Sequence, residues 1–184
     1  MMVVKVGGSL FDHPKLAPTL ADWLKNQSET KILLVAGGGR FADAVRELDR
    51  IHNLGEEASH WAALASLAAS AAVLKAMLVP YNLAKELEFI DCLAFARSDD
   101  DKPQSLPHTW QVTTDSLAAR IAVVRGCQRL VLLKSLLYIP EGSVWDVWDI
   151  AAKNGWVDEH FPTIAKCASF AIEAVDFRDW FDLK

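Results

Sequence analysis

The chain has 184 residues, of which 52% are hydrophobic and 23% are charged, and its formal net charge is −5 at pH 7. This composition excludes a disordered chain, and the length allows one substantial core, so we expect a single domain over residues 1–184. The negative charge argues against nucleic acid as the main partner.

The cysteines and the N-terminus indicate a cytoplasmic protein. An apolar strand is expected almost from Met1, which leaves no room for a signal peptide. The three cysteines are far apart and form no CxxC pair, so we expect reduced thiols in the core rather than disulfides or a metal site. They are Cys92, Cys127 and Cys167.

The first expected strand, residues 3–6, contains Lys5 and leads into Gly7, Gly8 and Ser9. A lysine in a buried strand needs a negative partner, and glycines let a phosphate approach backbone N–H groups. The stretch therefore fits a phosphate site that uses the charge of Lys5. It fits equally well a strand and a tight turn, with the lysine reaching solvent.

A second glycine loop follows the second expected strand, residues 31–36. Gly37, Gly38 and Gly39 end that strand, and a helix with an apolar face is expected from about residue 41 to 54. A glycine loop at the start of a helix offers free N–H groups and a positive dipole end to an anion. Neither loop matches the Walker A or the GxGxxG dinucleotide pattern.

The middle of the chain is expected to hold a helix, a strand and an acidic turn. The alanine-rich residues 62–79 fit a subunit contact or a core helix better than a membrane span. A strand is predicted at residues 92–96. The aspartates at positions 99–101 fit a solvated turn rather than a metal site.

The last third of the chain continues the alternation of helices and strands. A helix is expected near residues 113–122, with Thr114 or Asp115 as its cap, and a strand at 129–133 leads to Lys134. A short helix and a strand at about 170–175 follow. The alternation predicts an α/β fold, a three-layer α/β/α sandwich with a mainly parallel sheet. Ligands of such sheets lie beyond the carboxyl ends of the strands, where Lys5, both glycine loops and Lys134 converge.

Three ordered blocks carry a resemblance to a known family. They are VVKVGGSL, LLVAGGGRFADAV and HTWQVTTDSLAA, at residues 3–10, 33–45 and 108–119. Together they resemble the amino acid kinase family, which includes acetylglutamate, glutamate, uridylate and isopentenyl phosphate kinases. The resemblance implies an ATP-dependent small-molecule kinase that acts on a phosphate or carboxylate acceptor, with Mg²⁺ bound to the nucleotide. We expect a homo-oligomer with no nucleic-acid, membrane or protein-bound metal partner.

The resemblance also implies roles for individual residues. Lys5 would stabilise the transferring phosphoryl group, and Asp115 would organise that lysine. From the residues alone, Asp115 fits a helix cap better than a site residue, and Lys134 fits a solvated strand end better than a phosphate ligand. The residues implied in phosphate or nucleotide binding are Gly7, Gly8, Ser9 and Lys134. Those implied in substrate binding are Gly37, Gly38, Gly39, His60, His108, Thr114 and Ser116.

Three short stretches resemble one branch of this family, the aminomethylfuran phosphate kinases of methanofuran biosynthesis. They are Ser59-His60, the residues 108–110 with 114–116, and Val-Asp-Glu-His-Phe-Pro at residues 157–162. This branch phosphorylates a phosphate monoester to a diphosphate in one-carbon metabolism. A doubly anionic acceptor of that kind would suit backbone N–H groups, lysines and a histidine.

The chain departs from the family at the nucleotide loop. Family members carry a TDVDG-like loop after the strand that here ends at Leu133, and this chain has Lys134–Ile139 instead, with neither aspartate nor glycine. The chain is also short, which implies a shortened C-terminal nucleotide lobe. The alternatives are a non-catalytic homologue that acts as a phosphoryl-ligand-binding or regulatory subunit, and an unrelated anion-binding α/β domain.

Overall fold

The computed structural model describes residues 1–135 and 147–182. Five strands form one sheet in the order β3-β2-β1-β4-β5, and every neighbouring pair is parallel. The predicted α/β fold with a parallel sheet is confirmed. The strands are β1 (Met2–Val6), β2 (Lys31–Ala36), β3 (Glu86–Phe89), β4 (Arg129–Lys134) and β5 (Ala171–Asp176).

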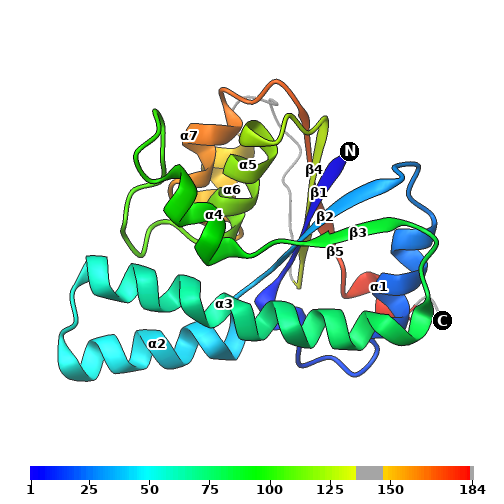
Figure 1. Ribbon diagram of the computed structural model, residues 1–184, viewed down its shortest axis with the longest axis horizontal. Helices are drawn as coiled ribbons and strands as arrows, with labels where there is room; N and C mark the ends of the chain where they lie inside the picture. Colours follow the sequence, from blue (N-terminus) through cyan, green and yellow to red (C-terminus); the bar gives the residue numbers. More distant parts are fainter. Residues whose placement is uncertain (136–146, 183–184) are drawn as a thin grey trace.

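Helices cover both faces of the sheet, which gives the three expected layers (Figure 1). On one face lie α4 (Cys92–Asp99), α5 (Thr114–Val124), α6 (Val147–Lys153) and α7 (Phe161–Ala165), and on the other lie α1 (Leu16–Lys25) and α8 (Asp179–Asp182). Two helices lead from β2 to β3, namely α2 (Gly39–His52) and α3 (Glu56–Leu78).

The central strands are buried on both faces, so their sequences are continuous apolar runs. Alternate residues point to opposite faces: Val3 belongs to the core under α5, and Val4 belongs to the core under α1. Lys5 is the exception in β1, because it is charged and only 5% exposed. Its side chain lies on the face that α5 covers, and it needs a partner there.

Three expectations from the sequence are wrong. Asp99 does not lie in a solvated turn, because it ends α4, is only 3% exposed and pairs with Arg120 at 2.6 Å. Residues 92–96 form the start of α4 rather than a strand, because the Asp91 carboxylate accepts a hydrogen bond from the Ala94 N–H at 2.9 Å and caps a helix there. The strand of this region is β3, a few residues earlier. Cys92 and Cys127 are buried free thiols as expected, but Cys167 is exposed.

The helices α2 and α3 form an antiparallel pair that extends to one side beyond the sheet (Figure 1). No residue of α2 is buried, although the helix is amphipathic. The run from Glu56 to Tyr81 is long and apolar enough to cross a membrane by length and composition, and 28% of its most apolar window is buried inside this fold. Its C-terminal half packs Leu74 and Leu78 into the core of the face that α1 covers.

Candidate active site

The two glycine loops meet at the carboxyl edge of the sheet. The N–H of Gly7 donates to the Leu133 carbonyl and that of Gly37 donates to the Val6 carbonyl, both at 2.8 Å, which carries the ladder beyond the strands. A Cβ on Gly8 would lie 2.2 Å from the backbone nitrogen of Gly39, and one on Gly37 would lie 2.4 Å from the nitrogen of Gly8. Only glycine permits this approach, so the backbones of the two loops pack directly against each other.

Lys5, Asp115 and Lys134 form a buried charge cluster beside these loops. The Lys5 ammonium lies 2.8 Å from Oδ1 of Asp115, and the Lys134 ammonium lies 2.7 Å from Oδ2. Lys134 donates a hydrogen bond, whereas the Lys5 contact is an ion pair that leaves Oδ1 without a hydrogen-bond donor among the described residues. Two cations share one anion, so the cluster carries a net positive charge toward any ligand.

The pKa values in the cluster follow from burial and from these neighbours. Burial raises the pKa of the Asp115 carboxyl, but the charges of Lys5 and Lys134 outweigh it and hold the pKa below its ordinary value. Burial and the neighbouring Lys5 ammonium lower the pKa of Lys134 to about 8, against the opposing effect of Asp115. Asp115 is therefore a carboxylate at neutral pH, and Lys134 is a cation that loses its proton in mild alkali.

Asp115 reaches the two lysines because it lies in the first turn of α5. Thr113 is the N-cap, and its hydroxyl accepts from the Asp115 N–H at 3.4 Å. The positive end of the helix dipole stabilises a carboxylate in that turn. The alternative role for Asp115, that of the helix cap, is thus filled by Thr113. The Asp115 side chain points to the two lysines instead.

A cavity of about 410 Å³ opens from this cluster and runs between α2, α3, α4 and the loop before α5. Ten of the predicted site residues line it: Lys5, Gly8, Ser9, Gly38, Gly39, His60, His108, Thr114, Asp115 and Lys134. Three predicted site residues are not in its lining. Gly7 and Gly37 are covered by the strand ends, and Ser116 donates its hydroxyl proton to Asp158 at 2.5 Å.

The far end of the cavity is an aromatic and charged cluster. The rings of His60 and His108 stack with centroids 4.5 Å apart, and Trp61 meets His108 edge-on at 4.9 Å. His108 bridges the Glu57 carboxylate at 2.6 Å and the Asp100 carboxylate at 2.8 Å. These contacts join α3 to the loop after α4 beside the cavity.

The two histidines have opposite pKa shifts. Burial and the nearby His108 lower the pKa of His60 to about 4, so His60 is neutral at pH 7. Partial burial lowers the pKa of His108, but its hydrogen bonds to Glu57 and Asp100 outweigh burial and raise that pKa above its ordinary value. A proton taken up by the stacked pair is therefore held on His108 rather than on His60.

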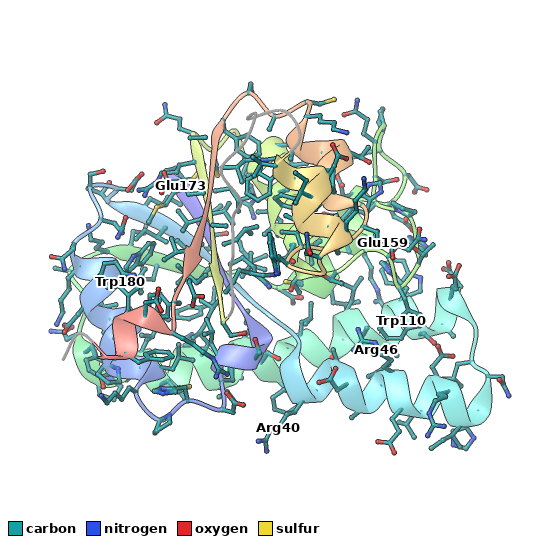
Figure 2. All side chains as sticks on the ribbon, turned by 180° about the vertical axis from the view of Figure 1, so that it is seen from behind. Arg40, Arg46, Trp110, Glu159, Glu173 and Trp180 are labelled. Atoms are coloured by element: carbon teal, nitrogen blue, oxygen red, sulfur yellow. The ribbon has the colours of Figure 1, made fainter. Side chains whose placement is uncertain are left out.

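Sequence reasoning missed several residues of the cavity. Arg46 lies over the ring of Trp110, 4.8 Å from its centroid, and both line the cavity from different elements (Figure 2). Asp49 accepts from the Trp110 indole N–H at 2.9 Å. Trp110 lay within the recognised third block, but only the folded loop shows that it faces the helical pair.

The donor set suits phosphate better than a bare metal ion. Backbone N–H groups and two ammonium groups are anion ligands. Among residues 1–135 and 147–182, no three His, Cys, Asp or Glu side chains gather in a way that could hold a metal. Of the stretch that replaces the family's nucleotide loop, residues 136–139 lie outside the described residues.

Comparisons with known proteins agree with the sequence resemblance. The profile of the amino acid kinase family matches residues 1–100. A curated relative, [5-(aminomethyl)furan-3-yl]methyl phosphate kinase of Methanocaldococcus jannaschii, is 27% identical over 180 residues, which cover 90% of this chain and 83% of the relative.

Solved structures share the fold at low sequence identity. UMP kinase from Ureaplasma parvum is 15% identical with a TM-score of 0.61, and the match covers 100% of this chain and 95% of that one. UMP kinase from Bacillus anthracis is 13% identical with a TM-score of 0.62, covering 96% and 87%. Uridylate kinase from Archaeoglobus fulgidus is 13% identical with a TM-score of 0.59, covering 94% and 89%.

Proposed function

This chain belongs to the amino acid kinase family, and from that membership we propose that it transfers the γ-phosphoryl group of ATP to a phosphate or carboxylate acceptor. It is a small-molecule kinase, since both the family and the named relative are kinases. The observation that carries the finer proposal is the cluster of Lys5, Asp115 and Lys134 beside the paired glycine loops.

Each part of the cluster has a task in phosphoryl transfer. Phosphoryl transfer depends on positioning and on stabilising the charge of the transferring group, rather than on covalent chemistry by the protein. Lys5 and Lys134 supply positive charge in a site that is largely shielded from water, and the glycine loops supply N–H donors. Asp115 offsets the charge of both ammonium groups and holds them in place. It is already paired with two cations, which disfavours it as a proton acceptor.

Bound Mg²⁺–ATP would supply the phosphoryl group and neutralise part of the charge on its phosphates. Lys5, Lys134 and the N–H groups around Gly8 would hold those phosphates. The proposal places no metal ligand on this chain.

We propose a phosphate monoester as the acceptor, as in the aminomethylfuran phosphate kinase relative, and a role in one-carbon cofactor biosynthesis. The cavity has one cationic end, at Lys5 and Lys134, and an aromatic end at His60, His108 and Trp110. The phosphate group of such an acceptor would bind at the cationic end, and a flat ring would stack at the aromatic end. Thr114 also lines the cavity.

The experiment is a phosphotransfer assay with Mg²⁺–ATP and a set of acceptors, beside calorimetry of Mg²⁺–ATP binding. We expect the aminomethylfuran phosphate to be converted to its diphosphate, and UMP and simple carboxylates such as acetylglutamate to react poorly. The Lys5→Met variant should lose turnover. If only a carboxylate acceptor is phosphorylated, the proposal of a phosphate acceptor is wrong. If no nucleotide binds at millimolar ATP, the proposal of an ATP-dependent kinase is wrong.

We also propose that the protein works as a cytoplasmic homo-oligomer of single-domain chains. The exposed side of α2 carries an apolar stripe at helical spacing, with Phe41 42%, Leu48 50% and Ile51 53% exposed. A second copy of the chain that covers this stripe would bury it. Light scattering should give more than one chain per particle, and Leu48→Glu should reduce that mass. A monomeric wild-type protein would refute this assembly.

A further inference from the structure

Asp158 is a buried carboxylate at the junction of α5 and α7, and it is surrounded by hydrogen-bond donors. Asp158 is only 9% exposed. Oδ2 accepts from the Thr113 N–H and hydroxyl, each at 2.9 Å, and from the Ser116 N–H at 3.0 Å. Oδ1 accepts from the Ser116 hydroxyl at 2.5 Å and from the Phe161 N–H at 2.9 Å.

The charge of Asp158 is balanced by these donors rather than by a cation. No ion pair among residues 1–135 and 147–182 includes Asp158. Burying a carboxylate is costly unless hydrogen bonds replace its hydration. Five donors and the positive end of the α5 dipole do so here. Such an arrangement holds only if the first turn of α5 and the turn before α7 keep their relative positions.

The same hydrogen bonds fix the backbone on both sides of Asp115. Thr113 donates its hydroxyl proton to Asp158, so the lone pairs of that oxygen face the Asp115 N–H, which donates to it at 3.4 Å. Ser116 is tied to Asp158 by its N–H and by its hydroxyl. Lys5 and Lys134 stand on the rigid strands β1 and β4, so any shift of this turn moves the Asp115 carboxylate relative to both.

We propose that Asp158 is a positioning residue for phosphoryl transfer, which holds the first turn of α5 so that Asp115 stays in contact with both Lys5 and Lys134. This inference rests on the proposed function, in which these three residues act on the transferring group. Asp158 also lines the cavity wall beside Val157, so the segment after α6 takes part in building the site.

The site requires a carboxylate and does not accept an amide. Oδ2 faces the N–H groups of Thr113 and Ser116, and Oδ1 faces the N–H of Phe161. In an asparagine, an NH₂ donor replaces one of these two oxygens. A backbone N–H is itself a donor, so it cannot accept a hydrogen bond from that group. In either orientation of the amide, its NH₂ group therefore faces at least one backbone N–H donor, and this repulsion displaces the turn.

The test begins with Asp158→Asn, measured by kcat, by KM for ATP and acceptor, and by Tm. We expect kcat to fall about 10- to 100-fold, since small misplacements of catalytic groups have effects of this size, with a smaller change in either KM. Leu24→Ala is the control for lost stability, because Leu24 is fully buried in α1 on the opposite face of the sheet. Assayed well below its Tm, that variant should keep the wild-type kcat.

A second readout does not depend on turnover. NMR titration of lysine-labelled protein, with Lys134→Arg to assign the signal, measures the pKa of Lys134. The Asp115 carboxylate raises that pKa, so Asp158→Asn should shift it downward, in the direction expected for Asp115→Asn. Wild-type protein without kinase activity would refute the proposed function, while this titration would still test whether Asp158 positions Asp115.

Two outcomes would overturn the positioning role. One is a kcat for Asp158→Asn within twofold of wild type, and the other is an unchanged pKa of Lys134. If Asp158→Asn does not fold, Thr113→Val and Ser116→Ala each remove one hydroxyl from the network and leave its backbone donors. At least one of these should then lower kcat and the pKa of Lys134 in the same direction, and unchanged values in both would also overturn the role.

Discussion

The Lys134 ammonium lies 2.7 Å from Oδ2 of Asp115, so the end of β4 is tied to the first turn of α5. Lys5 reaches the other oxygen of the same carboxylate from β1, at 2.8 Å. Because β1 and β4 are neighbours in the sheet, one aspartate holds both ammonium groups at the place where the glycine loops present their N–H groups. The arrangement is a preformed cationic site with one fixed internal anion.

Replacing Lys5 with methionine should lower kcat by about 10²- to 10³-fold, because a preorganised charge at the transferring group is lost while the side-chain length is kept. The matched control is Lys31→Met at the start of β2, a lysine that pairs with Glu86 at 2.6 Å and is 38% exposed. Steady-state phosphotransfer should be nearly unchanged in that control. Equal losses in both variants would contradict a specific role for Lys5.

The activity should depend on the protonation of Lys134. Its pKa of about 8 means that the ammonium is charged below pH 8 and becomes neutral as the pH rises further. We therefore expect kcat/KM to be level toward neutral pH and to fall above pH 8. In Lys134→Arg the guanidinium stays charged, so the alkaline fall should move to higher pH. An unchanged pH profile in that variant would assign the fall to another group.

Replacing Asp115 with asparagine leaves two buried ammonium groups without a counter-ion. Since the folded-state pKa of Asp115 is lowered, its stabilising effect is present above the ordinary carboxyl pKa and is lost as pH falls through the folded-state value. The free energy of unfolding at pH 7 should drop by about 3 kcal/mol. Urea unfolding from pH 7 to pH 3 should show this difference shrinking in acid, and a difference that is constant with pH would contradict the ion pairing.

The contact of the glycine loops should be sensitive to a single methyl group. In Gly8→Ala the new Cβ would meet the Gly39 nitrogen at 2.2 Å, so the loops must move apart and phosphate binding should weaken at least tenfold. Gly126→Ala is the control: its φ of +62° makes the alanine strained, but nothing lies within 4 Å of the added carbon. Calorimetry with ATP should distinguish the two variants at comparable Tm. Equal affinity in both would mean that the loop contact is not needed for binding.

Stability should also respond to the charge on His108. Its folded-state pKa is raised, so its stabilising effect is fully present below pH 6.5 and is lost as pH rises through the folded-state value. Glu57→Gln removes one of the two carboxylates that raise this pKa. The decline of wild-type Tm above pH 6.5 should be weaker in Glu57→Gln, with Glu47→Gln, on the exposed side of α2, as the control. Identical profiles in all three proteins would exclude the contribution of His108.

Much of the fold could be predicted from the chain because parallel strands buried on both faces have a strong signature. The apolar runs at residues 2–6, 31–36 and 129–134 are such strands. The failure at residues 92–96 has a local cause. A short apolar run fits a strand and a buried helix equally well. Here the Asp91 side chain caps the N-terminus of a helix and so stabilises the helix.

The site could be predicted where a residue type is improbable without a ligand or a partner. A lysine inside an apolar strand and two glycine runs after strands are such cases, and the structure brings Lys5 and the loops together. Asp158 and Arg46 could not be found this way, because an aspartate after a loop and an arginine on an amphipathic helix are ordinary. Their positions depend on contacts between segments far apart in the chain.

By itself, the sequence determined the α/β class, the two glycine loops and the presence of a lysine within an apolar strand, because these follow from local periodicity and from the residues themselves. Only the tertiary structure decided that Lys5 and Lys134 share Asp115, that Ser116 faces Asp158 rather than the cavity, and that His60 stacks on His108. The physical reason is that ion pairs and ring contacts depend on distances between elements, and those distances are set when helices pack on the sheet.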